Sequence, residues 1–296
     1  MHDGNRPDIR ALETEAYEQH GYFTVDLSIV VVDVPAGTAK RTYQTVTAFH
    51  ASPDCDTAPI PVPQGGAVEG FMGMPGGLTG YQCAGFAGGD DCHMLFLARD
   101  EHRLYEAYHA TIVGSTFSVG CLALWDTSRV YDDHGRGDQC TSADAAGYPM
   151  APLLFTAEEI AAGSINHAIR FALPNDMLRA KVYVPPATHG TNTTGPTTSL
   201  PYGARMRLKT PYAGMSQLSP AAQIVARALQ KYGMFHADGG NVPLMGQNDV
   251  LGKVKYADVG FDTHALMALK ATDFEVIEYA TPVPVTFNCM RTPIAQ

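Results

Sequence analysis

The sequence is poor in charged residues, and it lacks basic clusters and long apolar runs. Only 17% of its 296 residues are charged, and 30 acidic against 20 basic residues give a formal net charge of -10. Without a group of Lys and Arg to follow a phosphate backbone, nucleic acid is not expected as a partner. The longest apolar run, Leu27–Val34, is interrupted by Ser28 and Asp33. It is far shorter than the roughly 20 residues that cross a bilayer, so we expect a soluble protein with no membrane partner.

Motifs that identify metal and nucleotide sites by their spacing are also missing. The sequence contains no CxxC pair, no HExxH or HxH, no GxxxxGK[ST] loop and no GxGxxG. A GxSxG elbow is absent too, so a nucleophilic role for Ser142 in TSADA has no support. We therefore predict no metal and no cofactor.

Six cysteines form an even set: Cys55, Cys83, Cys92, Cys121, Cys140 and Cys289. Most of them lie where loops are expected to be long, and disulfides that close long loops stabilise most in the chain-entropy model. We predict disulfides formed in an oxidising compartment, with free thiols in a cytosolic protein as the alternative. Residues 1–19 are polar and mixed in charge and do not have the pattern of a leader peptide. The cysteines favour a secreted protein, and we therefore expect its leader peptide to be absent from this sequence.

Glycine and proline are abundant, at 29 and 20 residues, which is typical of a turn-rich β protein. We predict a mainly β fold, a single-domain β-sandwich or jelly-roll-like structure with two or three short helices. The domain is expected to span residues 21–296, after a loosely ordered segment at residues 1–20. The sequence has no internal repeat and no change of composition near its middle that would favour two domains.

Local patterns predict the individual elements. Strands are predicted at residues 22–34, 42–50, 93–97, 104–109, 111–125, 168–173, 179–184, 204–210 and 274–277. The third and fourth of these flank a polar turn and predict a β-hairpin, whereas residues 51–91 are so rich in Pro and Gly that we expect a long surface loop.

Helix signals occur at three places. Thr156 and Glu159 have the spacing of a capping box and Gly163 provides a stop, which predicts a two-turn helix. Ser219-Pro220 begins the clearest helix, which ends at Gly233. A further short helix is expected at residues 263–270.

Seven blocks follow one another in a recognisable order: IPVPQGGAVEG, DDCHMLFLARDEHRLYEAYHA, TSADAAGYPMAPLLFTAEEIAAGSINHAIRF, VYVPPATH, YGARMRLK, ARALQKYGMFHADGG and ATDFEVIEY. This succession resembles a family of exported bacterial and fungal proteins whose members are frequently attached to carbohydrate-binding or immunoglobulin-like modules. The resemblance covers roughly residues 60–279. It implies secretion and a role on polysaccharide, but the family has no well-established activity, so no mechanism comes with it.

The same resemblance marks ten polar positions: Glu69, Asp91, His93, Glu106, Asp144, Glu159, His167, Arg170, His189 and Asp238. Residues 111–140 depart from the family pattern, which typically has a Gly-Ser-Gly strand and an Asn-rich loop there. A changed loop beside a site would alter substrate choice, so specificity cannot be transferred.

Paired carboxylates are the usual groups for glycosidic cleavage, one protonated as the acid and one ionised as the base or nucleophile. Asp144 in SADAAG and Asp238 in HADGG are the first candidates, with Glu106 and Glu69 behind them. Each Asp also has a purely structural interpretation, because Asp in a tight turn commonly accepts backbone N–H groups. Glu159 is assigned mainly to helix capping.

Histidine and arginine complete the predicted site. His93 and Glu106 lie on the two arms of the predicted hairpin, where a suitable register would place them on one face and make His93 a general base. His167 and Arg170 are an odd number of residues apart and would point to opposite faces of a strand. We assign His167 to the cleft, and Arg170 to a structural ion pair or to binding an acidic sugar.

The predicted catalytic residues are therefore Asp144, Asp238, Glu106, His93 and His167, and the predicted substrate-binding residues are Glu69, Trp125, Arg170 and His189. Trp125, the single tryptophan, is the best candidate for stacking on a sugar ring. The favoured function is an extracellular glycoside hydrolase acting on a polysaccharide or oligosaccharide. A polysaccharide lyase and a non-catalytic carbohydrate-binding or cell-surface module are the alternatives.

Overall fold

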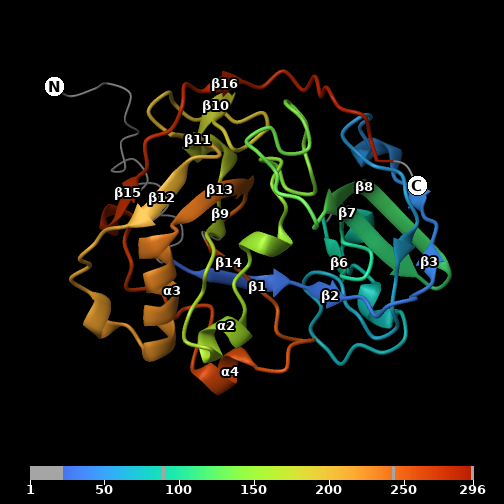
Figure 1. Ribbon diagram of the computed structural model, residues 1–296, viewed down its shortest axis with the longest axis horizontal. Helices are drawn as coiled ribbons and strands as arrows, with labels where there is room; N and C mark the ends of the chain where they lie inside the picture. Colours follow the sequence, from blue (N-terminus) through green and yellow to red (C-terminus); the bar gives the residue numbers. More distant parts are fainter. Residues whose placement is uncertain (1–22, 89–90, 242–243, 295–296) are drawn as a thin grey trace.

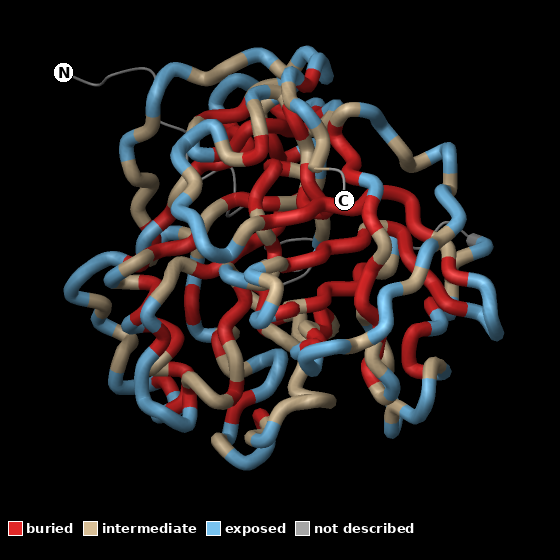
Figure 2. The backbone as a smooth tube through the Cα atoms, turned by 45° about the vertical axis from the view of Figure 1, so that its right-hand side comes forward, coloured by how far each residue is buried: buried red, intermediate tan, exposed pale blue. Residues whose placement is uncertain are grey.

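The computed structural model describes residues 23–88, 91–241 and 244–294. Within these ranges the protein is mainly β, as predicted, and it has three short α-helices: α2 (Ala157–Ala161), α3 (Pro220–Lys231) and α4 (Tyr256–Val259). Buried segments of the chain occupy the interior, and exposed segments lie around the periphery (Figure 2). The predicted segment at residues 1–20 lies outside the described residues.

The larger of the two main sheets has five strands. In order across the sheet these are β2 (Val31–Asp33), β6 (Met94–Ala98), β7 (Arg103–Val113), β8 (Thr116–Asp126) and β4 (Gln44–Thr45). β6 and β7 form the predicted hairpin, in the register that pairs Leu95 with Glu106. β7 and β8 are long antiparallel neighbours on the right of Figure 1.

The second main sheet has four strands and lies on the left of Figure 1. Its order is β15 (Phe274–Val276), β12 (Arg205–Leu208), β13 (Met234–Gly239) and β9 (Ile169–Leu173), with β13 and β9 parallel. Helix α3 connects β12 to β13, and its residues Val225 and Leu229 are buried in the apolar core beside this sheet. It begins where Ser219 caps the nitrogen of Ala222, and the chain leaves it at Gly233, whose φ of 74° favours glycine.

Smaller sheets complete the fold: β1 (Val25–Ile29) with β14 (Leu244–Gln247), β10 (Leu178–Tyr183) with β11 (Leu200–Tyr202) and β16 (Val283–Pro284), and β3 (Lys40–Arg41) with β5 (Ile60–Pro61). β1 and β2 follow one another and join the two halves (Figure 1). Each half has its own apolar core, and a third, smaller cluster that includes Ile29, Leu95 and Ala172 lies where the halves meet.

Two predicted elements are wrong. Of the strand expected at residues 42–50, only β4 forms, because it lies at the edge of its sheet and the chain then turns through residues 47–49, where Phe49 donates its N–H to the carbonyl of Val46. The helix expected at residues 263–270 is instead a series of turns, with hydrogen bonds from Ala265 to Asp262 and from Met267 to His264. The strand expected at residues 22–34 is interrupted at Val30.

All six cysteines are paired, as predicted, in the disulfides Cys55–Cys121, Cys83–Cys92 and Cys140–Cys289. The last of these joins residues 149 apart in the sequence and ties the C-terminal segment to the middle of the chain. Among the described residues, no helix has both the length and the apolar character that crossing a bilayer requires.

Candidate functional site

A cavity of about 250 Å³ is lined by residues from both halves of the molecule. Three carboxylates face it, those of Asp91, Asp144 and Asp238. Its other lining groups include the aromatic rings of Phe49 and Tyr108, the hydroxyls of Thr141, Ser142 and Thr191, and the Cys55–Cys121 disulfide.

Arg170, on β9, is the cation behind this cavity. Its side chain is only 1% exposed, and its Nη2 donates to Asp144 Oδ2 at 3.1 Å and to Asp238 Oδ2 at 3.3 Å. Leaving a buried guanidinium without a partner would cost several kcal/mol, so the two carboxylates and the cation stabilise one another. Two Asp residues that are 94 positions apart in sequence are thereby held on one nitrogen atom.

Asp144 lies in the small-residue turn that the sequence suggested. Its Oδ1 accepts the N–H of Ala146 at 3.2 Å, and its own N–H donates to Ser142 Oγ at 3.0 Å. Gly147 closes the turn with a φ of 82°, where a Cβ would meet the hydroxyl of Thr188. The structural and functional interpretations of Asp144 are therefore compatible, because the carboxylate caps its turn with one oxygen and contacts Arg170 with the other.

The Asp144 side chain is fully buried, and burial raises its pKa to about 7. Arg170 opposes this shift, whereas the nearby charges of Asp238 and Glu106 add to it. Two carboxylates that share one cation cannot both ionise cheaply, so this pair retains a proton close to neutral pH.

Asp238 lies at the end of β13, just past a bulge in the pairing with β9. Its Oδ1 accepts the N–H of Gly239 at 2.8 Å, and its side chain is 24% exposed. Burial raises the pKa of Asp238, while Arg170 and His93 act in the opposite direction. Because Asp238 is the more exposed member and lies near a second cation, it is the one that ionises first.

His93 is not placed as the general base that the sequence suggested. Its Nδ1 lies 2.7 Å from Glu69 Oε2, and its Nε2 donates to the carbonyl oxygen of Ala143 at 3.0 Å. Burial lowers the pKa of His93, but the Glu69 charge and hydrogen bond outweigh it and raise the pKa to about 9. The ring is therefore a buried cation with both nitrogens engaged, and it has no lone pair to accept a proton from a substrate.

Glu69 is the carboxylate that orients His93, and it reaches the ring from the long Pro- and Gly-rich loop. Its Oε2 also accepts the backbone N–H of His93 at 3.0 Å, and its Oε1 accepts Ser28 Oγ at 3.3 Å. Glu69 is not among the residues that line the cavity. Its predicted role in substrate binding is thus replaced by an ion pair that supports the turn before Asp144.

Glu106 and Trp125 are partners in the interior rather than parts of the cavity wall. Glu106 shares a sheet face with His93, as expected for a suitable register, but it is fully buried. Its carboxylate accepts hydrogen bonds from Trp125 Nε1 at 3.0 Å and from the backbone N–H groups of Met150 at 2.8 Å and Ala151 at 2.9 Å. Burial raises the pKa of Glu106 to about 7. Trp125 is 3% exposed, so its ring has no free face for a sugar. Neither residue lines the cavity, so the predicted roles of Glu106 in catalysis and of Trp125 in sugar stacking are not supported.

His167 and His189 also differ from their predicted roles. His167 lies before β9 and pairs with Glu159 at 3.1 Å, where Glu159 closes the predicted capping box of α2 with Thr156. His167 does not line the cavity to which it was assigned, whereas Arg170 forms a buried ion pair, which is one of the two roles predicted for it. His189 donates from Nδ1 to the carbonyl of Ala145 at 2.9 Å and does not line the cavity.

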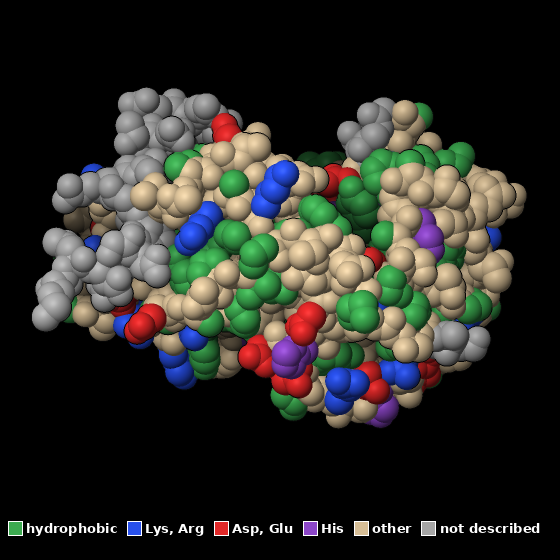
Figure 3. All heavy atoms as spheres, turned by 90° about the horizontal axis from the view of Figure 1, so that it is seen from above, with side chains coloured by type: hydrophobic (Ala, Val, Ile, Leu, Met, Phe, Trp, Pro, Cys, Tyr) green, Lys and Arg blue, Asp and Glu red, His purple; other side chains and the backbone are tan. Residues whose placement is uncertain are grey.

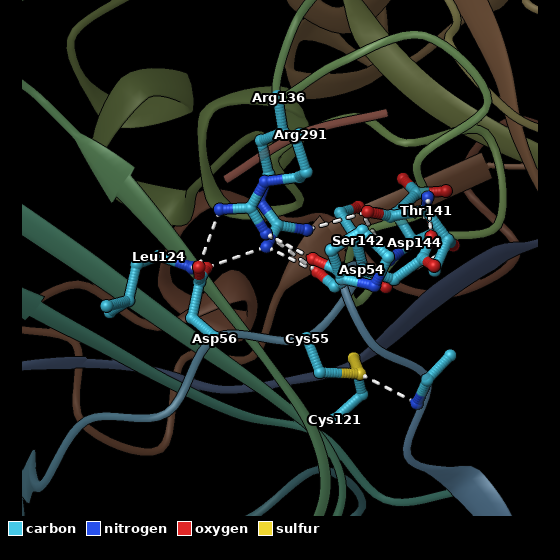
Figure 4. The surroundings of a disulfide bond; sticks show 12 residues. Asp54, Cys55, Asp56, Cys121, Leu124, Arg136, Thr141, Ser142, Asp144 and Arg291 are labelled. Atoms are coloured by element: carbon cyan, nitrogen blue, oxygen red, sulfur yellow. Dashed lines mark hydrogen bonds and ion pairs between the residues drawn. A yellow bond between two sulfur atoms is a disulfide. The ribbon is translucent and has the colours of Figure 1, made fainter. Parts of the chain in front are cut away.

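A second ionic network holds the other end of the Asp144 turn, as Figure 4 shows. Arg136 donates to the carbonyl of Thr141 at 2.6 Å and to Asp56 Oδ2 at 2.7 Å, and Arg291 donates to Asp56 Oδ1 at 2.6 Å. The N–H of Thr141 donates to Asp54 at 2.8 Å. The backbone from Thr141 to Ala143 is thus anchored by charged groups on both sides, which restricts where the Asp144 carboxylate can lie.

Sequence reasoning did not single out Phe49, Tyr108, Asp56, Arg136 or Arg291. Tyr108 follows Ala107, which pairs with Met94, and its ring lies 5.4 Å from that of His93, so the hairpin register could have placed it beside the site. The other four come from loops whose approach to the cavity depends on disulfides and long-range ion pairs. Local patterns carry no signal for such contacts.

Within the described residues, one group of possible metal ligands lies close together, namely Asp54, Cys140 and Cys289. The two sulfur atoms form a disulfide, so they offer no thiolate, and one carboxylate remains. This group does not fit a metal ion.

No family model matches the chain, and neither a curated protein nor a solved structure resembles it significantly. The function is therefore inferred from the geometry of the site.

Proposed function

We propose that the protein is a secreted glycoside hydrolase in which Asp144 is the general acid and Asp238 is its ionised partner. The supporting observation is that two carboxylates from distant segments face one cavity and share one buried guanidinium, with the pKa of Asp144 raised to about 7. Glycosidic cleavage requires such a pair, in which the environment keeps one carboxyl protonated and the other charged.

Each group then has a definite task. Asp144 donates its proton to the glycosidic oxygen as the bond from this oxygen to the anomeric carbon breaks, and Asp238 attacks that carbon to form a glycosyl ester. Water, deprotonated by Asp144, then hydrolyses the ester, which releases the sugar and returns the proton to Asp144. Arg170 keeps Asp238 ionised, because its Nη2 lies 3.3 Å from that carboxylate. His93 and Arg136 touch neither group directly, and their part is to position the turn that carries Asp144.

The geometry favours hydrolysis over elimination from a uronate. A lyase neutralises the substrate carboxylate with a cation, but Arg170 already contacts two carboxylates. Of the described residues that line the cavity, none is Lys or Arg. Secretion is proposed from the three disulfides, which are typical of oxidising compartments.

Incubation with a panel of neutral and acidic polysaccharides tests this function. We expect new reducing ends without the ultraviolet absorbance of an unsaturated uronate, and a loss of about 10²- to 10⁴-fold in Asp144→Asn, the range for removal of a general acid. Asp100→Asn, an exposed Asp away from the cavity, is the matched control and should keep full activity. Retention on a polymer without cleavage would identify a binding module instead, and unsaturated products would identify a lyase.

A further inference from the structure

We propose that the cavity accepts one non-acidic pyranose ring, so that the enzyme releases single sugars from chain ends rather than cutting within a chain. This inference rests on the proposed hydrolase function and adds the class of sugar and the mode of attack. Four features support it: the size of the cavity, the difference in burial between its two ends, the charge of its lining and one unpaired hydroxyl.

The size of the cavity matches one ring. Its volume of about 250 Å³ is below the roughly 300 to 1,000 Å³ of pockets that enclose drug-sized ligands. A single hexose is smaller than such ligands, whereas two linked rings are comparable to them. An enzyme that cuts within a chain needs room for rings on both sides of the cleaved bond, and this cavity does not provide it.

The burial of the lining residues indicates a pocket with one open end. Asp144 is fully buried, as is Cys121, which forms one of the disulfides in the wall, whereas Asp91 and Ala51 are exposed. A ring that enters past Asp91 would stop against the turn of Asp144. The rest of the chain would leave past Asp91, so only the terminal ring is enclosed, which is the arrangement of an exo-acting enzyme.

The charge of the lining excludes an acidic ring. Asp91, Asp144 and Asp238 face the cavity, and the described lining residues include no Lys, Arg or His. Arg170 lies behind two of these carboxylates and compensates one charge. With Asp144 protonated, Asp91 and Asp238 still outweigh the single positive charge of Arg170, so the carboxylate of a uronate would be repelled by a net negative charge. On the face of the molecule that Figure 3 shows, the coloured Lys and Arg side chains are scattered among other residues.

Tyr108 supplies the polar contact that orients the ring. It lines the cavity, and its hydroxyl has no hydrogen-bond partner among the described residues. Its ring packs edge-on against Phe49, with centroids 5.9 Å apart, so the two residues form an aromatic wall with one free hydroxyl. Sugar sites combine such an apolar surface with a few placed polar groups.

Product analysis on neutral oligosaccharides tests the mode of attack. We expect a monosaccharide as the first and only small product from the earliest times, with the remaining chain shortened by one ring. A ladder of intermediate oligosaccharides would overturn the inference while leaving the hydrolase function intact. Failure to cleave any glycan would instead count against the hydrolase function.

Binding measurements test the sugar class independently of turnover. In the Asp144→Asn variant, titration calorimetry should show at least tenfold weaker binding of methyl glucuronide than of methyl glucoside. Asp91→Lys added to this variant should narrow that difference several-fold, because it replaces a repelling charge at the open end with an attracting one. Equal or tighter binding of the glucuronide before this change would overturn the inference. Tyr108→Phe should weaken the binding of methyl glucoside by about tenfold without affecting Tm.

Discussion

His93 donates from Nε2 to the carbonyl oxygen of Ala143, 3.0 Å away, so a buried imidazolium holds the residue immediately before Asp144. Its other nitrogen is paired with Glu69 at 2.7 Å. The cation that supports the site is therefore itself sensitive to pH, and this couples the shape of the Asp144 turn to the protonation of His93.

The free energy of unfolding should fall between pH 6.5 and pH 9. The pKa of His93 is raised to about 9 in the folded protein, above its ordinary value of 6.5, so its stabilisation is complete below pH 6.5 and is lost as the pH passes the folded value. The total loss should be on the order of 3 kcal/mol. Denaturant titrations at several pH values measure it.

His93→Gln should remove most of this pH dependence, since glutamine can still donate to Ala143 but does not titrate. His264→Gln, a change of an exposed histidine, is the control and should keep the wild-type slope. An unchanged slope in His93→Gln would show that the ring does not titrate in this range.

Activity should follow a bell-shaped dependence on pH. The alkaline limb is expected near pH 7, because the pKa of Asp144 is raised to about 7 and Asp144 cannot act as the general acid once it is deprotonated. The acid limb reflects protonation of Asp238. Asp91→Asn should move the acid limb to lower pH, because the charge of Asp91 contributes to the raised pKa of Asp238. Profiles of kcat/KM measure both limbs, and full activity above pH 9 would contradict Asp144 as the acid.

Hydrolysis should retain the anomeric configuration. Asp144 Oδ2 and Asp238 Oδ2 lie 3.1 and 3.3 Å from the same Arg170 nitrogen, so their separation cannot exceed the sum of these distances. Contact with one nitrogen atom keeps the two carboxyl groups close together, as in retaining enzymes, whose carboxyl groups are about 5 to 5.5 Å apart, compared with roughly 6.5 to 9.5 Å in inverting enzymes. Proton NMR of the first-formed anomer decides between them, and inversion would be incompatible with direct attack by Asp238.

Loss of the Arg136–Asp56 ion pair should be strongly destabilising. Both side chains are at most 2% exposed, and Arg136→Met would leave a buried carboxylate short of a partner, at a cost of about 3 to 5 kcal/mol. Arg99→Met breaks an ion pair with Asp33 that is about 70% exposed and should cost at most about 1 kcal/mol. Urea unfolding compares the two variants. Similar costs would mean that Arg291 alone satisfies Asp56.

Much of the local structure could be predicted because its signals lie within a few residues. Thr156 and Glu159 form the expected capping box, and Ser219 begins the expected helix. Predictions were wrong where a tertiary neighbour was missing or different. The strand at residues 42–50 fails because it lies at a sheet edge, and His93 takes Glu69 rather than Glu106 because the long loop brings Glu69 to the ring.

The sequence by itself determined the mainly β character, the helix caps and three polar residues at the centre of the site, Asp144, Asp238 and Arg170. Turn chemistry and side-chain periodicity act over a few residues, so they can be read along the chain. Only the tertiary structure decided which of these residues meet: it places Arg170 between Asp144 and Asp238 and buries Trp125 against Glu106. The physical reason is that a buried charge is stable only with a partner within hydrogen-bonding distance. The packing of the sheets decides which residue is close enough, and that residue can be far away in the sequence.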